Sequence, residues 1–162
     1  MHHQPDGAAF DIVLLLHVGC VVVGLVTTAT AAATATRLRR LLGSPVPLPE
    51  TLRRYFMPGI NWAGRTVYGI PVFGFALLAL SRGAYTLGQG WVLGGLALFA
   101  GAALAGEGVM WPAERRLQVA LTSTDVPPPV ESLDQDAVAM SRAATAALVL
   151  LVAGTVLMVA QP

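Results

Sequence analysis

Four long apolar runs alternate with more polar segments along this 162-residue chain. The runs cover about residues 11–36, 62–81, 91–111 and 143–160. Each approaches the ~20 residues that a helix needs to cross a bilayer. The pattern predicts an all-α fold, in which a polytopic membrane protein forms a bundle of four transmembrane helices as a single membrane domain over residues 1–162.

Composition supports a membrane protein. Apolar residues make up 55% of the chain and charged residues 12%, where a soluble domain carries roughly 25% charge. The one cysteine excludes an internal disulfide and any multi-cysteine metal site. A net charge of +1 gives no electrostatic case for nucleic acid.

Arginine counting predicts the orientation. The tails carry no arginine, and the segment between the second and third runs carries one, Arg82. The segments 37–61 and 112–142 hold most of the others: Arg37, Arg39, Arg40, Arg53, Arg54, Arg115, Arg116 and Arg142. Because basic loops stay in the cytoplasm, both segments are predicted to be cytoplasmic loops, with both termini outside the cytoplasm. The expected location is a bacterial inner (plasma) membrane.

Aromatic residues and one proline add detail to the spans. Trp62, Trp91, Trp111 and Tyr55 lie near predicted span ends, where amphipathic rings favour the membrane interface. Pro71 lies in the middle of the second run and predicts a kink, because its ring removes one backbone hydrogen bond.

The cytoplasmic loops also contain helical patterns. Leu52, Tyr55 and Phe56 share one face, which predicts one or two turns of helix on the inner membrane surface. In the second loop, prolines predict a stiff spacer, and Ser132 with Gln135 predicts a capping box that starts a helical extension of the fourth span. The alternative is that both loops are plain solvated linkers.

Glu107 is a carboxylate within the third apolar run, four residues before its inner end and so about 6 Å deep. Arg65 lies at a similar depth on the second run, and Arg142 at the same level on the fourth. A nearby helix C-terminus repels an anion, which favours a cationic partner. We therefore expect a structural ion pair of Glu107 with Arg65 or Arg142. The alternatives are a proton or cation site and a simple snorkelling residue.

His17 is the one histidine within a predicted span. Cys20 lies one turn away on the same face, and Met158 lies at a comparable level on the fourth span. These residues are candidate ligands for haem or copper, since His/Met is a known axial pair and cysteine is a soft ligand. No metal motif accompanies them, so a histidine that is hydrogen-bonded to a neighbouring helix is favoured.

Small residues recur four positions apart. Cys20 and Gly24 lie on the first span, and "GGLALFAGAALAG" pairs Gly101 with Ala105 and Ala102 with Gly106. Such patterns let helix backbones approach closely. They leave open whether the packing is within one bundle or against a partner.

Several segments together carry a resemblance. They are "LLLHVGCVVVG", the arginine-rich first loop, "FMPGINWAGRTVYGIPVFGFALL", "VMWPAERRL" and "SRAATAALVLLVAG". In order and spacing the chain resembles a family of bacterial four-helix predicted integral membrane proteins akin to the copper-resistance D membrane domain. The resemblance implies a four-helix bundle and little about activity.

These observations favour a non-catalytic accessory or scaffolding subunit of a membrane complex, with no enzyme activity and no cofactor. Its expected partners are the lipid bilayer and either other membrane subunits or further copies of itself. One alternative is a haem- or copper-binding redox or metal carrier using His17. Another is a proton- or ion-coupled transporter using Glu107.

Overall fold

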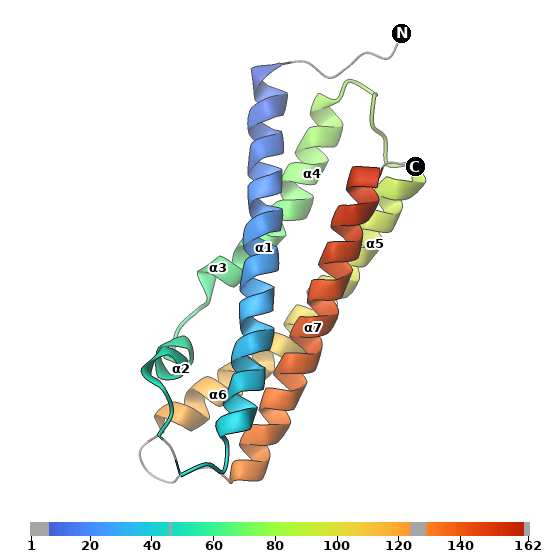
Figure 1. The fold of residues 1–162 in the computed structure, drawn as a ribbon. Coiled ribbons are helices and arrows are strands. Elements are labelled where there is room, and N and C mark those ends of the chain that lie inside the picture. The colour runs from blue at the N-terminus through green and yellow to red at the C-terminus, as the bar shows by residue number, and fades with distance from the viewer. Residues whose placement is uncertain (1–6, 46, 124–128, 161–162) are drawn as a thin grey trace. The chain divides into compact units, whose positions relative to one another are not determined.

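The computed structural model describes residues 7–45, 47–123 and 129–160, and within these ranges every regular element is helical (Figure 1). The elements in chain order are α1 (Ala8–Leu41), α2 (Glu50–Tyr55), α3 (Trp62–Arg65), α4 (Gly69–Leu80), α5 (Gly90–Ala105), α6 (Trp111–Thr122) and α7 (Val130–Ala160). Four helical stretches are long and apolar enough to cross a membrane: Ala8–Leu41, Trp62–Leu80, Gly90–Thr122 and Val130–Ala160. The prediction of a four-helix membrane bundle is confirmed.

The helices run well past the predicted spans. α1 continues to Leu41, and the chain then turns at Gly43, where a positive φ of 80° is open to glycine without strain. The third stretch continues through Trp111 to Thr122. The segments predicted as loops are therefore helical over much of their described length, and they are not plain linkers.

The predicted helical extension of the fourth span is confirmed, but its predicted cap is wrong. α7 begins at Val130, so Ser132 lies inside the first turn. There the Ser132 hydroxyl donates a 2.8 Å hydrogen bond to the Pro129 carbonyl. The hydroxyl therefore does not cap the helix from outside it. Pro127 and Pro128, part of the predicted spacer, lie outside the described residues.

Pro71 disturbs the second span one turn before its own position. The segment Thr66–Tyr68 is a 3-10 turn between α3 and α4. A proline at position 71 has no N–H to donate to the carbonyl of Val67, so the regular ladder is interrupted at that residue. A short tightened turn is a common way to absorb such an interruption.

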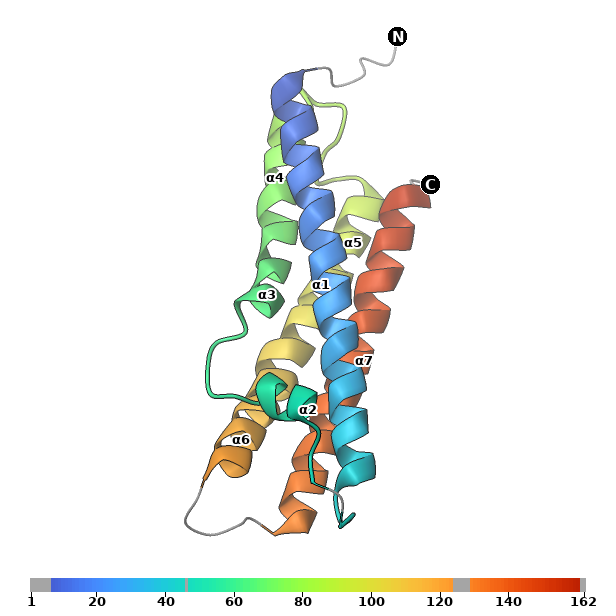
Figure 2. The same cartoon turned by 60° about the vertical axis from the view of Figure 1, so that its left-hand side comes forward.

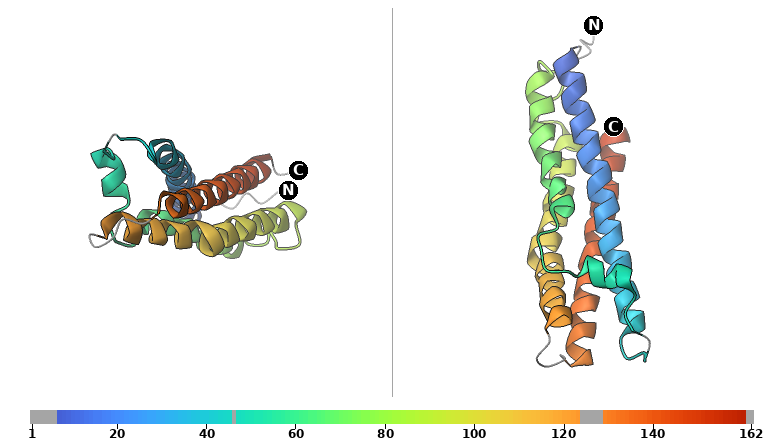
Figure 3. Two further views of the ribbon diagram at one scale, coloured as in Figure 1. Left: turned by 90° about the horizontal axis from the view of Figure 1, so that it is seen from below. Right: turned by 90° about the vertical axis from the view of Figure 1, so that its left-hand side faces the viewer.

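The chain forms two compact units, and α1, α5 and α7 contribute to both. The first unit comprises residues 1–27, 61–101 and 149–162. Within it the N-terminal half of α1 packs against α4, and α5 packs against the C-terminal part of α7 (Figures 1 and 3). Glycines line both contacts. Because a glycine has no side chain, the neighbouring helix can approach its backbone closely.

The second unit comprises residues 28–60 and 102–148. It packs the end of α1, the short α2, α6 and the start of α7, with α2 beside α6 and α1 (Figures 1 and 2). Its core contains large buried side chains together with many alanines, which allow close helix approach: Leu38, Leu52, Phe56, Leu117, Met140, Ala35, Ala113, Ala137 and Ala144.

Polar contacts also join the helices of the second unit. The hydroxyls of Thr36 on α1 and Ser141 on α7 are 2.9 Å apart. Arg39 pairs with Asp134 at 2.9 Å, which links α1 to α7. A further ion pair at 2.8 Å links Arg116 of α6 to Asp136 of α7.

The spans carry large apolar side chains on their outward faces. Leu15, Leu104 and Val159, for example, are each more than 70% exposed. In water, apolar faces of this extent would drive aggregation, whereas in a bilayer they meet lipid chains. Together with the length of the helices, they identify a multi-pass membrane protein.

Candidate functional site

His17 occupies a defined place in the contact between α1 and α4. Its side chain is buried, and Nδ1 lies 2.9 Å from the carbonyl oxygen of Ile70. A carbonyl can only accept, so Nδ1 carries the hydrogen and donates it, which leaves Nε2 of a neutral ring as an acceptor. The expected hydrogen bond between His17 and a neighbouring helix is confirmed.

Glycines on α4 explain why α1 can come so close. A Cβ at Gly74 would lie 3.4 Å from His17 Cε1, and a Cβ at Gly69 would collide with Cys20 Sγ. One turn further along α1, a Cβ at Gly24 would lie 3.4 Å from Val67 Cγ2. The small residues Cys20 and Gly24 therefore serve packing inside this unit.

Met158 makes a similar packing contact elsewhere in the first unit. Its Cε would lie 2.7 Å from a Cβ at Gly95, so the thioether lies across the backbone of α5. Within residues 7–45, 47–123 and 129–160, no group of three or more His, Cys, Asp or Glu residues is arranged to hold a metal ion. The structure thus brings His17 and Cys20 to one helix face and gives Met158 a packing role on α5.

Glu107 lies in a π-helical segment, Gly106–Met110, between α5 and α6. Trp111 N–H donates to the Gly106 carbonyl, five residues back, and Pro112 has no N–H to offer Gly108. Glu107 is exposed on this widened turn. It and Arg65 each make polar or electrostatic contacts, and an ion pair between the two stays a prediction.

Arg142 differs from its expected role. It is exposed on α7 and makes no ion pair within the part of the chain that the structure describes.

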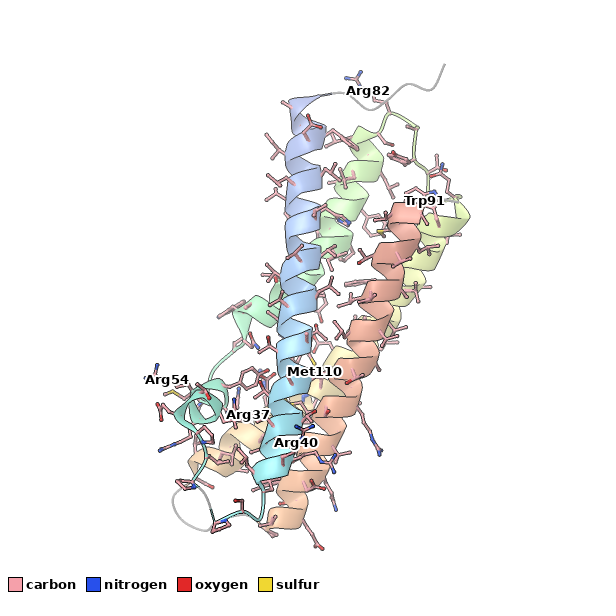
Figure 4. The ribbon with its side chains drawn as sticks, viewed as in Figure 1. Arg37, Arg40, Arg54, Arg82, Trp91 and Met110 are labelled. Carbon is pink, nitrogen blue, oxygen red and sulfur yellow. The ribbon has the colours of Figure 1, made fainter. Side chains whose placement is uncertain are left out.

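The four aromatic residues expected at the membrane interface have different surroundings. Trp62 is 72% exposed, as an interface anchor would be. Trp91, labelled in Figure 4, packs edge-to-face against Tyr85, with the ring centroids 5.7 Å apart. Trp111 is buried against Gly106 inside the second unit. Tyr55 also points inward, and its hydroxyl is buried. The last two rings therefore stabilise the protein interior.

A buried polar group lies in the second unit. Glu114 and Gln118 on α6 are buried, although the two arginines that follow Glu114 are exposed. The buried Tyr55 hydroxyl has no hydrogen bond of regular geometry to any described residue, yet the Glu114 carboxylate lies close enough to act on it as a charge and an acceptor. The pair links α2 to α6.

Burial raises the pKa of the Tyr55 phenol above its ordinary value, and the nearby negative charge of Glu114 raises it further. The phenol is thus held in its protonated form and can donate a hydrogen to the carboxylate.

Glu114 was not among the residues predicted from the sequence, although the spacing of its neighbours contains a signal. Trp111, Glu114 and Gln118 recur at three- and four-residue spacing, which places them on one helix face with Leu117. Arg115, Arg116 and Val119 lie on the opposite, exposed face. A carboxylate on the apolar side of such a helix indicates a buried polar partner.

Comparisons of the chain with protein-family models, with curated proteins and with solved structures gave no match. The resemblance to the bacterial four-helix membrane family therefore stays a prediction.

Proposed function

We propose that this chain is a small non-catalytic accessory or scaffolding subunit of a membrane complex. It resides in a bacterial inner membrane with both termini outside the cytoplasm. Its partners are the lipid bilayer and other membrane subunits or further copies of itself.

The proposal is carried by one observation, the hydrogen bond and packing contacts that His17 makes between two helices. The one histidine in a described span gives its Nδ1 hydrogen to the Ile70 carbonyl, and its ring lies against Gly74. Cys20, the other reactive side chain on this face, packs against the backbone of Gly69. The two side chains in this contact that could bind a metal or react, those of His17 and Cys20, thus join one helix to another. Such contacts are what a structural subunit requires.

A second candidate, a haem- or copper-binding redox or metal carrier, has one observation in its favour. Histidines that ligate metals commonly donate their other ring N–H to a backbone carbonyl, which fixes the ring and its tautomer. His17 makes this kind of bond through Nδ1, so Nε2 is the atom that would face a metal. Met158 is a weak candidate for the second ligand, because its thioether already packs on Gly95.

The transporter alternative depends on Glu107. Ionisable groups at membrane depth are functional candidates, and π-helical segments occur often at functional sites. A Glu107→Gln variant that inserts normally but abolishes a proton- or ion-coupled transport activity would support this alternative.

The test is purification from native membranes in mild detergent, read by visible spectroscopy, metal analysis and mass spectrometry. We expect a colourless protein that co-purifies with a larger membrane assembly at constant stoichiometry. A Soret band or stoichiometric copper that disappears in His17→Ala would overturn the proposal and support the metal carrier. His17→Asn, which keeps a donor, serves as the control for loss of folding.

A further inference from the structure

Three arginines of the second unit have no acidic partner among the described residues. Arg37 and Arg40 on the last turns of α1, and Arg53 on α2, are exposed (Figure 4 labels the first two). None of the three has an ion pair within residues 7–45, 47–123 and 129–160. Neighbouring arginines do find acids: Arg39 pairs with Asp134, and Arg54 pairs with Glu50.

The local charge is strongly one-sided. Between residues 37 and 60 the chain carries five arginines and one carboxylate, Glu50. That carboxylate is already paired with Arg54 at 3.1 Å. The guanidinium groups of Arg37, Arg40 and Arg53 therefore face the exterior with positive charge that no described acid compensates, and such charge attracts an anion.

Apolar side chains accompany this charge. Leu52 and Phe56 are buried and fix α2 to the unit, while Met57 and Ile60, which follow on the same segment, are 61% and 51% exposed. An anion with hydrocarbon attached would satisfy both kinds of surface. A free inorganic anion or a nucleic acid would leave the apolar side chains in water.

The position along the chain fits the same ligand. Arg37 and Arg40 lie three residues apart in the last two turns of Ala8–Leu41, one of the membrane-spanning stretches. They are therefore at the level where a helix leaves the hydrocarbon and meets headgroups. Clusters of four or more basic residues at this level are typical of contacts with anionic lipid headgroups.

We propose that Arg37, Arg40 and Arg53, with Met57 and Ile60, bind an anionic phospholipid, whose phosphate meets the guanidinium groups and whose acyl chains meet the apolar side chains. This inference concerns a lipid ligand and does not depend on the identity of the protein partners.

The test uses the full chain in nanodiscs of phosphatidylcholine doped with phosphatidylglycerol, with bound lipid counted by native mass spectrometry after release. The site variant is Arg37→Gln/Arg40→Gln/Arg53→Gln. The matched control is Arg82→Gln/Arg115→Gln/Arg142→Gln, which removes the same charge from exposed arginines that also lack an ion pair within the described ranges.

We expect wild type to retain phosphatidylglycerol in preference to phosphatidylcholine. Each arginine should contribute about five-fold to the affinity for phosphatidylglycerol, so the site variant should bind this lipid on the order of a hundred-fold more weakly. The affinity of the control variant should change little. Equal losses in the two variants would overturn the proposal, because they would show general electrostatic attraction. Displacement of the lipid by millimolar inorganic phosphate, or an absence of lipid preference, would also overturn it. The single variant Arg53→Gln repeats the test. It changes one exposed side chain, so it is the variant that should disturb folding least.

Discussion

Gly69 has no space for even a methyl group, because Cys20 Sγ of α1 lies too close to the position that its Cβ would take. Two residues from different helices thus fix how closely α1 and α4 approach. In a membrane, where lipid chains are as apolar as the side chains, such close packing is a main source of helix association. The stability of the first unit is therefore sensitive to single atoms at this contact.

Gly69→Ala should destabilise the protein in detergent by about 1–3 kcal/mol, the usual range for forcing an extra carbon into a packed interior. Cys20→Gly should restore part of the loss, because it removes the side chain that the new methyl group meets. Thermal unfolding followed by circular dichroism measures both effects.

Gly19→Ala is the matched control, since Gly19 lies on α1 beside Cys20 and has no atom within 4 Å of an added Cβ. A loss for Gly19→Ala as large as that for Gly69→Ala would contradict the assigned contact.

The stability of the folded protein should depend on pH through Tyr55, and the surroundings of its phenol set the direction of that dependence. The folded-state pKa of this phenol is raised above its ordinary value of 10.0 by burial and by Glu114. The folded protein therefore keeps this proton at pH values where the unfolded chain has lost it. The resulting stability is fully present below about pH 10 and is lost as pH rises further, toward the folded-state pKa.

Tyr55→Phe should make stability fall less steeply above about pH 10 and should remove the late component from the ultraviolet phenolate titration. The difference between the wild-type and variant titrations isolates Tyr55 from Tyr68 and Tyr85. The difference between the two titration curves belongs to the Tyr55 phenol. If that phenol titrates at its ordinary pKa, Tyr55 is not buried beside Glu114.

Residue environments were partly predictable from the sequence. The hydrogen bond of His17 to another helix followed from its place inside an apolar span. The burial of Trp111 and Tyr55 did not follow, because their positions near span ends suit a lipid-facing belt equally well. Which face of a helix meets protein depends on its neighbours, and a single sequence carries that information weakly.

At the scale of elements, the first half of α7 is tied to two neighbours by ion pairs. Arg39 with Asp134 links it to α1, and Arg116 with Asp136 links it to α6. These side chains are partly exposed to solvent, so screening keeps their contributions small.

Asp134→Asn and Asp136→Asn should each cost about 0.2–1 kcal/mol at low ionic strength and less at high salt. Denaturation midpoints in detergent at two salt concentrations measure the difference. Arg142→Gln changes a charge on the same helix that has no ion pair to a described residue, so it should have no comparable salt-dependent effect. Losses for the aspartate variants that are independent of salt would rule out ion pairing as their source.

The contact between α5 and α7 should be more tolerant than that between α1 and α4. A Cβ at Gly95 meets the end of the flexible Met158 side chain, whereas a Cβ at Gly69 meets the short side chain of Cys20. Gly95→Ala should therefore cost less than Gly69→Ala in the same thermal assay. The reverse order would contradict this ranking of the two contacts.

The lengths of the elements show where a hydropathy pattern stops being informative. The pattern identified four spans, because an uninterrupted run of about 20 apolar residues is typical of a membrane-crossing helix and rare elsewhere. It ended the third span near Trp111 and began the fourth near residue 143, whereas the helices continue to Thr122 and start at Val130. Those extensions are amphipathic and packed on protein, so apolar content alone does not mark their ends.

At the scale of the whole molecule, we propose four membrane crossings with the arginine-rich segments on the cytoplasmic side. The distribution of arginines supports this orientation, and the proposed phospholipid site lies on one of these segments. In this arrangement Thr51, on α2, and Ala84, which follows α4, lie on opposite sides of the membrane.

The most direct test of that claim is cysteine labelling in intact cells. A Cys20→Ala background removes the one native cysteine, and single cysteines are then placed at the exposed positions Thr51, on α2, and Ala84, after α4. A membrane-impermeant maleimide should label Ala84→Cys in intact cells and Thr51→Cys only after the membrane is permeabilised. Labelling of Thr51→Cys from outside, or equal labelling of both, would contradict the arrangement of four crossings proposed for this protein.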